Sequence, residues 1–244
     1  MSTKQITFYT AAWSPHAERV RFALDEAGAK YTVHEFGLEF NKGPKPEWYY
    51  QINPLGKIPA LTYGGPAVPP DQPSPESAKL FESLPLLEFI AEIYPEANLL
   101  PTDPILRTKA RTFIQLYQNY FHDLLKDVFF LGKPADPILQ AIETLQQALP
   151  PTGFAVGQFS IADIAVAPSF MRMMLFLKSE LGAYSEEDGQ KMREALASEK
   201  FVRFRRYIED LHEWPSIKKN WDEAFQIGLW KNVPAFQRKA TAPT

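Results

Sequence analysis

Ser14 and Pro15 stand directly before an amphipathic stretch, residues 16–28, in a chain of 244 residues that contains no cysteine. A serine followed by a proline is a favoured helix start, because the serine hydroxyl accepts a hydrogen bond from a backbone N–H of the first turn. The same hydroxyl can instead donate a hydrogen bond to an anionic group that reacts at the helix N-terminus. On these two residues alone capping is favoured, and the catalytic interpretation stays open.

Other common chemistries lack the residues that they need. Without cysteine the chain has no disulfides, no thiolate metal ligands and no sulfur nucleophile of its own. The sequence contains no GxSxG elbow and no GxxxxGK[ST] loop. Four histidines show no metal-ligand spacing: His16, His34, His122 and His212. Metal, nucleotide and serine-hydrolase sites are therefore not expected.

The composition is that of a soluble globular protein, with 45% hydrophobic and 23% charged residues. The net charge of −3 argues against nucleic-acid binding, and we interpret the densest basic cluster, residues 203–207, as a solvated helix face. No apolar run reaches the length of a membrane span, and the N-terminus lacks the apolar region of a signal peptide. A cytoplasmic protein that does not bind membranes is expected.

The elements around Ser14 predict a small α/β domain that ends near residue 95. A strand, a helix and a second strand are expected at 5–10, 15–28 and 31–38, with the two strands parallel. Gly28 is expected to end the helix. A hairpin of strands 58–65 and 79–82 follows, joined by a loop rich in proline at 64–75, and then a helix over 83–95.

Beyond residues 95–104 the pattern becomes helical, which marks a domain boundary. An apolar stripe from Ala110 to Val128 predicts one long helix. Ser160 and Asp163 form a capping box at the start of an apolar and therefore central helix. Further helices are expected at 136–148, 160–181, 186–196, 198–211 and 214–225.

This layout resembles that of the glutathione transferases. The motifs "NPLGKIPAL" at 53–61 and "FES" at 81–83 carry the resemblance, and "KPEW" at 45–48 and "TAAWSPHAERVR" at 10–21 are closest to the omega class. The resemblance implies a thioredoxin-like, glutathione-binding domain over residues 1–96, an all-helical domain over 104–244 that contributes a hydrophobic pocket, and a homodimer. Glutathione would be the co-substrate, without a metal.

The same resemblance implies a role for each glutathione-binding residue. Pro59 would follow a cis peptide bond and the backbone of Ile58 would pair with the cysteinyl unit, as an added strand does. Lys45 would reach the glycine carboxylate, and Glu82 and Ser83 the γ-glutamyl end. Each residue also has an ordinary interpretation: Ser83 as an N-cap, Lys45 and Glu82 as surface charges. Together at matching positions they favour the binding site.

The chain departs from the pattern that it resembles at Ser14, where omega-class members commonly carry cysteine. Serine cannot form a mixed disulfide with glutathione, so thioltransferase and dehydroascorbate reductase activities are not expected. A serine hydroxyl can stabilise the glutathione thiolate, and such a hydrogen bond would lower the thiol pKa by about one to two units. We therefore expect Ser14 to be the catalytic residue of a conjugating enzyme.

The second substrate is expected between Ser14 and the helical domain, in a pocket for hydrophobic or phenolic compounds. Six aromatic residues are candidates for its lining, although most of a helical aromatic stripe is usually core: Tyr117, Tyr120, Phe121, Phe129, Trp221 and Trp230. Two functions stay open, detoxifying conjugation of aromatic electrophiles and ligandin-type carriage of aromatic compounds without catalysis. A scaffold role is less favoured, because the site motifs are intact.

Overall fold

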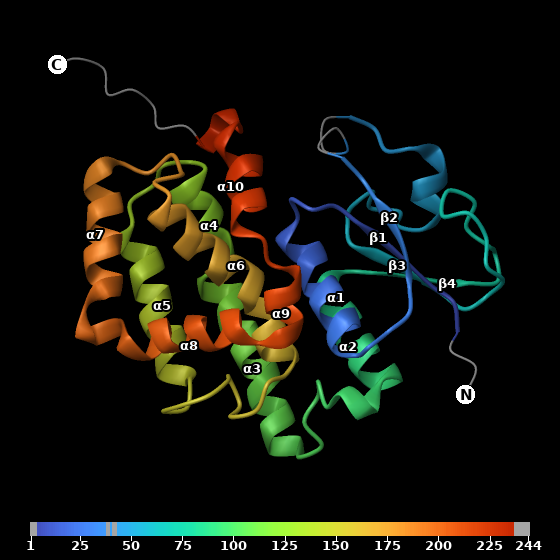
Figure 1. The fold of residues 1–244 in the computed structure, drawn as a ribbon, viewed down its shortest axis with the longest axis horizontal. Helices are drawn as coiled ribbons and strands as arrows, with labels where there is room; N and C mark the ends of the chain where they lie inside the picture. The colour runs from blue at the N-terminus through green and yellow to red at the C-terminus, as the bar shows by residue number, and fades with distance from the viewer. Residues whose placement is uncertain (1–3, 38–39, 41–42, 237–244) are drawn as a thin grey trace. The chain divides into compact units, whose positions relative to one another are not determined.

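The computed structural model describes residues 4–37, 40 and 43–236 (Figure 1). Contacts divide the chain into two units, which meet in the sequence between Leu100 and Pro101. The first is a small α/β unit with a thioredoxin-like fold, and the second is mostly helical. This fold class is the one predicted from the sequence.

The first unit is built on a four-stranded mixed sheet with the order β2-β1-β3-β4. Its strands are β1 (Ile6–Thr10), β2 (Thr32–Glu35), β3 (Ala60–Tyr63) and β4 (Ala78–Phe81). The pairing of β1 with β2 is parallel and that of β3 with β4 is antiparallel, which confirms the predicted crossover and hairpin. The second strand is shorter than predicted, and residue 38 at its expected end lies outside the described residues.

The described part of this unit contains the α-helices α1 (Pro15–Glu26) and α2 (Ser83–Ile93), which pack against each other. Figure 1 shows both on the same side of the sheet. The guanidinium of Arg21 on α1 lies 5.6 Å from the ring centroid of the fully buried Phe8, so this side of β1 faces the helix. Gly28, with φ +59, follows the C-cap of α1, as predicted.

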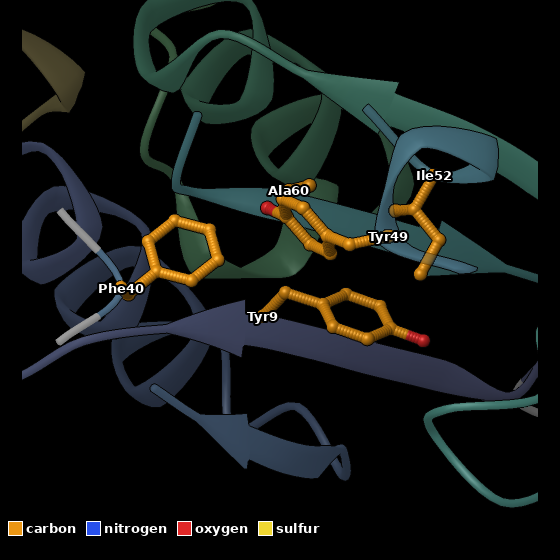
Figure 2. Close-up of a cluster of buried hydrophobic side chains, with 5 residues drawn as sticks. All are labelled: Tyr9, Phe40, Tyr49, Ile52 and Ala60. Carbon is orange, nitrogen blue, oxygen red and sulfur yellow. The ribbon is translucent and has the colours of Figure 1, made fainter. Parts of the chain in front are cut away.

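The opposite side of β1 carries an aromatic cluster in place of a long helix. Tyr9 packs with residues of η2 (Glu47–Gln51) and its flanks, and the buried members are Tyr9, Phe40, Tyr49, Ile52 and Ala60 (Figure 2). The Tyr9 hydroxyl donates to the carbonyl of Pro70 at 2.7 Å, and burial raises the pKa of Tyr9 to about 12. The loop over 64–75 is thus tied to the sheet through Tyr9.

The second unit surrounds the apolar helix α6 (Ile161–Lys178), of which nearly every side chain is buried. Ser160 and Asp163 form the predicted capping box at its start. The other helices are α3 (Pro104–Tyr120), α4 (His122–Phe129), α5 (Asp136–Ala148), α7 (Glu186–Ala197), η4 (Glu199–Phe201), α8 (Val202–Glu213), α9 (Pro215–Asn220), α10 (Glu223–Lys231) and η5 (Pro234–Phe236), after the short η3 (Pro95–Ala97) of the first unit.

Two predicted helices are each broken in two. The long helix expected through Val128 stops at Phe121, which has φ −115 and is held in the core by the ring of Phe170, 4.9 Å away. The helix expected over 214–225 ends at Asn220, and Asp222 caps the next one by accepting from the N–H of Phe225. Both breaks leave the apolar face continuous, so the periodicity did not reveal them.

The basic cluster at 203–207 is not simply a solvated face. Arg203 donates to the carbonyls of Pro150 and Gly153, and Arg205 donates to those of Leu196 and Ser198. Arg203 thus connects α8 to the loop that contains Pro150 and Gly153, and Arg205 connects it to the C-terminal end of α7, while Arg206 remains largely in solvent. Among the described residues, no helix combines the length and the apolar character that crossing a bilayer requires.

Candidate active site

The sheet register brings three distant segments to one end of the first unit. Tyr9 is paired with Ala60, and Ala60 is paired with Phe81. Ser14 follows the end of β1, Ile58 and Pro59 precede β3, and Glu82 and Ser83 follow β4. Strand pairing therefore gathers the predicted site residues, apart from Lys45, at the same end of the sheet.

Ser14 is the N-cap of α1, with extended backbone angles and 2% of its surface exposed. Its Oγ accepts a hydrogen bond of 3.2 Å from the N–H of Ala17, which confirms the capping interpretation. Capping uses a lone pair of the hydroxyl and leaves its proton to be donated to another group. The cap and a thiolate contact are therefore compatible in one side chain.

Glu82 has backbone angles that an L-residue rarely adopts, φ 73 and ψ 117. Such a conformation costs about 1 to 3 kcal/mol and persists where the surrounding structure imposes it. Glu82 precedes α2 but makes no capping hydrogen bond with its exposed side chain. A strained backbone with an acidic side chain left in solvent is typical of a ligand-contacting position.

Ser83 is not the N-cap that its ordinary interpretation required, because it is already the first residue of α2. Its side chain is 6% exposed and its Oγ accepts a hydrogen bond of 3.1 Å from Nη1 of Arg19. Arg19 lies on α1 and is 1% exposed. The sequence interpretation missed Arg19, although its spacing of three from His16 and four from Ala23 placed it beside the apolar stripe of the helix.

The Ile58–Pro59 peptide bond is cis, as the family motif implied. Pro59 has no backbone N–H to pair, and β3 begins only at Ala60. Ile58 is partly exposed and packs against the aromatic cluster of Figure 2. Its backbone thus lies before the strand ladder, at the sheet end that also carries Ser14.

Lys45 lies just before η2 and is tied to its own loop. Its ammonium group contacts the carbonyl of Phe40, donates to that of Gly43 at 3.3 Å, and lies 4.2 Å from the centroid of the Phe40 ring. An ammonium group carries three N–H donors, so one remains for an anionic ligand. Phe40 in turn packs on Tyr49, which connects Lys45 to the cluster on β1.

The six aromatic candidates for the hydrophobic pocket lie in different environments. Tyr117, Phe121 and Phe129 are fully buried in the second unit, where the Tyr117 hydroxyl is 2.7 Å from Oγ of Ser169. Tyr120 is 54% exposed. Trp221 and Trp230 are partly buried, and the indole N–H of Trp230 donates to Gln226.

Trp221 lies between α9 and α10, and the centroid of its ring is 6.1 Å from that of His212. Its indole nitrogen is buried and has no hydrogen-bond partner among the described residues, a rare state for a buried donor. The guanidinium of Arg172 lies 5.6 Å from the centroid of the Trp221 ring. Trp13 Nε1, one residue before Ser14, is in the same state.

The described residues include no group of three or more histidine, cysteine, aspartate or glutamate side chains placed to hold a metal ion. The donors at the candidate site are a serine hydroxyl, an ammonium group and helix N-terminal amides. Such donors suit an organic anion rather than a metal.

The chain is similar in sequence to known proteins. The family model described as the N-terminal domain of glutathione S-transferase matches residues 13–93, which contain Ser14, Lys45, Ile58, Pro59, Glu82 and Ser83. Mouse glutathione S-transferase omega-2 is 27% identical over 46% of this chain, and the match spans only 39% of the mouse protein.

Solved structures match over nearly the whole chain. The crystal structure of glutathione transferase Omega 2S from Trametes versicolor is 54% identical, covers 96% of this chain and all of its own, and superimposes with a TM-score of 0.90. A second structure of that protein is a complex with 2,4-dihydroxybenzophenone. Omega 1C from the same fungus is 42% identical over 94% of this chain and 98% of its own, with a TM-score of 0.87. With its sequence and its fold both matched, this chain belongs to the omega class of the glutathione transferase family.

Proposed function

We propose that this chain conjugates the thiolate of glutathione to hydrophobic, aromatic electrophiles, and that Ser14 stabilises the thiolate. The observation that carries the proposal is the state of Ser14, a buried N-cap whose hydroxyl accepts from Ala17 and keeps its own proton to donate. The site also lies at the N-terminus of α1, where the helix dipole favours a negative charge.

The magnitudes are sufficient for an ionised nucleophile at neutral pH. A free thiol has a pKa near ~8.5. A hydrogen bond to a charged group contributes about 1.5 to 3 kcal/mol and the helix terminus about 0.3 to 1 kcal/mol, and 1.36 kcal/mol corresponds to about one pKa unit. The two effects together lower the thiol pKa to about 7 or below, so the thiolate is the main form.

The remaining site residues are assigned to the three parts of glutathione. Lys45 binds the glycine carboxylate with its third N–H, and the backbone of Ile58, before Pro59, pairs with the cysteinyl unit. Glu82 binds the α-ammonium group and Ser83 donates to the γ-glutamyl carboxylate, which also faces the N-terminus of α2. The positive φ of Glu82 supports this assignment, because the turn that imposes it places two adjacent polar side chains at one helix start.

The second substrate is inferred to be an aromatic compound with a polar oxygen. The unsatisfied indole N–H of Trp221 supports this class, and the Trametes versicolor relative at 54% identity binds 2,4-dihydroxybenzophenone, a phenol and a ketone. Trp230 and the exposed Tyr120 are further candidates for contacts. The fully buried side chains would not contact the ligand directly and would instead support the residues that do: Tyr117, Phe121 and Phe129.

Ligandin-type carriage without catalysis is the second candidate function. The benzophenone complex of the relative favours it, because that ligand has no leaving group for a thiolate to displace. Carriage would use the aromatic residues and would not require Ser14.

Replacing Ser14 by Ala separates the two functions. For a conjugating enzyme, the rate with glutathione and an activated nitroaryl chloride falls at least about tenfold, because the pKa of the bound thiol rises by about one unit and less thiolate is present. The binding of 2,4-dihydroxybenzophenone is unchanged. Ser185→Ala is the matched control, because Ser185 caps α7 by the same type of bond, to Asp188. An unchanged rate in Ser14→Ala removes Ser14 from the mechanism and leaves the carrier function.

The ultraviolet titration of bound glutathione is the direct measurement. No protein thiol contributes, because the chain has no cysteine. For the same reason we propose that thioltransferase activity is absent. By analogy with its family, we also propose a cytoplasmic homodimer that detoxifies aromatic compounds; light scattering tests the dimer and a fluorescent fusion tests the location.

A further inference from the structure

Arg19 is a buried charge that connects α1, which is capped by Ser14, with α2, which begins at Ser83. Its Nη1 donates to Oγ of Ser83 at 3.1 Å, across 64 positions of sequence, and lies 3.0 Å from Nδ1 of His16. The residue is 1% exposed. A fully buried arginine is rare in proteins and is kept where its charge is paired or used.

The bond from Arg19 decides which way the Ser83 hydroxyl can act. A guanidinium group only donates, so Oγ of Ser83 is the acceptor and the hydroxyl proton must be donated elsewhere. A hydroxyl that accepts from a cation is a stronger donor in turn, because hydrogen bonds in a chain polarise one another. Ser83 is thereby set as a donor to an anion, with a positive charge behind it.

We propose that Arg19 is the positioning residue for the α-carboxylate of the γ-glutamyl unit, acting through the hydroxyl of Ser83. The inference rests on the proposed function, in which Ser83 meets that carboxylate. The same proposal predicts a substrate preference. The Arg19–Ser83 pair favours thiol peptides whose first residue is linked through its side-chain carboxyl and so keeps a free α-carboxylate, over thiols that lack this group. Arg19 itself does not touch the reacting sulfur.

The test compares two thiols in variants of α1. Arg19→Met keeps the volume of a long buried side chain and removes the donor, and Arg19→Lys keeps a charge without the planar geometry. Arg21→Gln is the matched control, because Arg21 lies on the same helix and pairs with Glu35 instead. Glutathione is compared with cysteinylglycine, which has the same thiol and glycine carboxylate but no γ-glutamyl unit.

We expect Arg19→Met to raise the KM for glutathione at least about tenfold and to leave kcat/KM for cysteinylglycine unchanged. Arg19→Lys should give a smaller rise, and Arg21→Gln none with either thiol. In Arg19→Met/Ser83→Ala the loss should be no greater than in Ser83→Ala alone, because both changes break one relay. Additive losses overturn the proposal, as does an equal loss with both thiols, which indicates a merely structural role.

Two failures are distinguishable. If the unaltered protein neither binds nor conjugates glutathione, the proposed function itself is wrong. If it does so, and folded Arg19→Met keeps its KM for glutathione, only the role of Arg19 is wrong. Should Arg19→Met not fold, the double-mutant cycle is run with Arg19→Lys and Ser83→Ala, and additivity there overturns the relay.

Discussion

The hydroxyl of Tyr207 on α8 donates to Oδ1 of Asp163 at 2.7 Å, deep in the second unit. The same carboxylate accepts from the backbone N–H groups of Ala155 and Ser160 and from the Ser160 hydroxyl. One side chain thus joins the start of the central helix to a loop and to a neighbouring helix. Despite these donors, complete burial raises the pKa of Asp163 to about 6.

The raised pKa of Asp163 predicts a stability that falls as pH rises. Between the unfolded value of 3.8 and about 6, the folded protein binds the proton more tightly than the unfolded chain does. The contribution is therefore full below pH 3.8 and is lost by about pH 6, by about 3 kcal/mol at most. In urea unfolding, the free energy of unfolding of the wild type should fall over this range relative to that of Asp163→Asn.

Tyr207→Phe is the companion variant for Asp163. The change removes a donor that favours the carboxylate form of Asp163, so the pKa of Asp163 should rise further. Tyr207→Phe should therefore lose more stability with rising pH than the wild type does. A difference between the wild type and Asp163→Asn that is independent of pH would contradict the raised pKa.

Glu82→Gly and Glu82→Ala test the strain before α2. Both variants lack the carboxylate, so both should weaken glutathione binding to the same extent. Glycine tolerates a φ of 73 and alanine does not, so Glu82→Gly should have the higher free energy of unfolding, by about 1 to 2 kcal/mol. Equal stability of the two variants in denaturant unfolding would show that Glu82 carries no strain.

Ser14→Cys is predicted to gain the chemistry that the wild type lacks. A thiol at the N-terminus of α1 should be largely ionised and should form a mixed disulfide with glutathione disulfide, seen by mass spectrometry as one adduct. Ser185→Cys, at the N-cap of α7, is the control and should react at least about tenfold more slowly, because it has a helix N-terminus but no glutathione site. Similar rates for both thiols would argue against a glutathione site at Ser14.

Tyr9→Phe should loosen the loop at 64–75. The change removes the bond to the carbonyl of Pro70, at a cost of about 1 kcal/mol, and should speed cleavage of the loop by a non-specific protease. Tyr31→Phe is the control, since its hydroxyl donates to Asp25 and not to the loop. Unchanged cleavage of Tyr9→Phe would mean that the contacts of Lys79 with Ser74 and Ser77 suffice.

Features with a local cause were predictable from the sequence. The cap at Ser14, the glycine that follows α1 and the box of Ser160 with Asp163 are each set by neighbouring residues, and the structure confirms them. The break at Phe121 was not predictable, because the apolar stripe continues on both sides of it and the stop depends on packing with Phe170.

The candidate site also combines residues that were predictable from local motifs with a contact that was not. Motifs of a few residues identified Lys45, the Ile58–Pro59 pair and Glu82 with Ser83 as candidates. The bond between Arg19 and Ser83 crosses two helices, so no local pattern could indicate it. The family resemblance gave no conformational information on Glu82 either, whose positive φ is imposed by the turn from β4 into α2.

The register of Tyr9 with Ala60 and of Ala60 with Phe81 has an evolutionary consequence. Slipping β4 by one residue would turn its side chains to the other face of the sheet and displace Glu82 and Ser83, which follow it, so an insertion within these strands disrupts the site without altering any of its residues. The loop over 64–75 lies between β3 and β4, outside the paired positions. Descendants of this chain can therefore change length in that loop while the site keeps its geometry, and that is where insertions and deletions should accumulate.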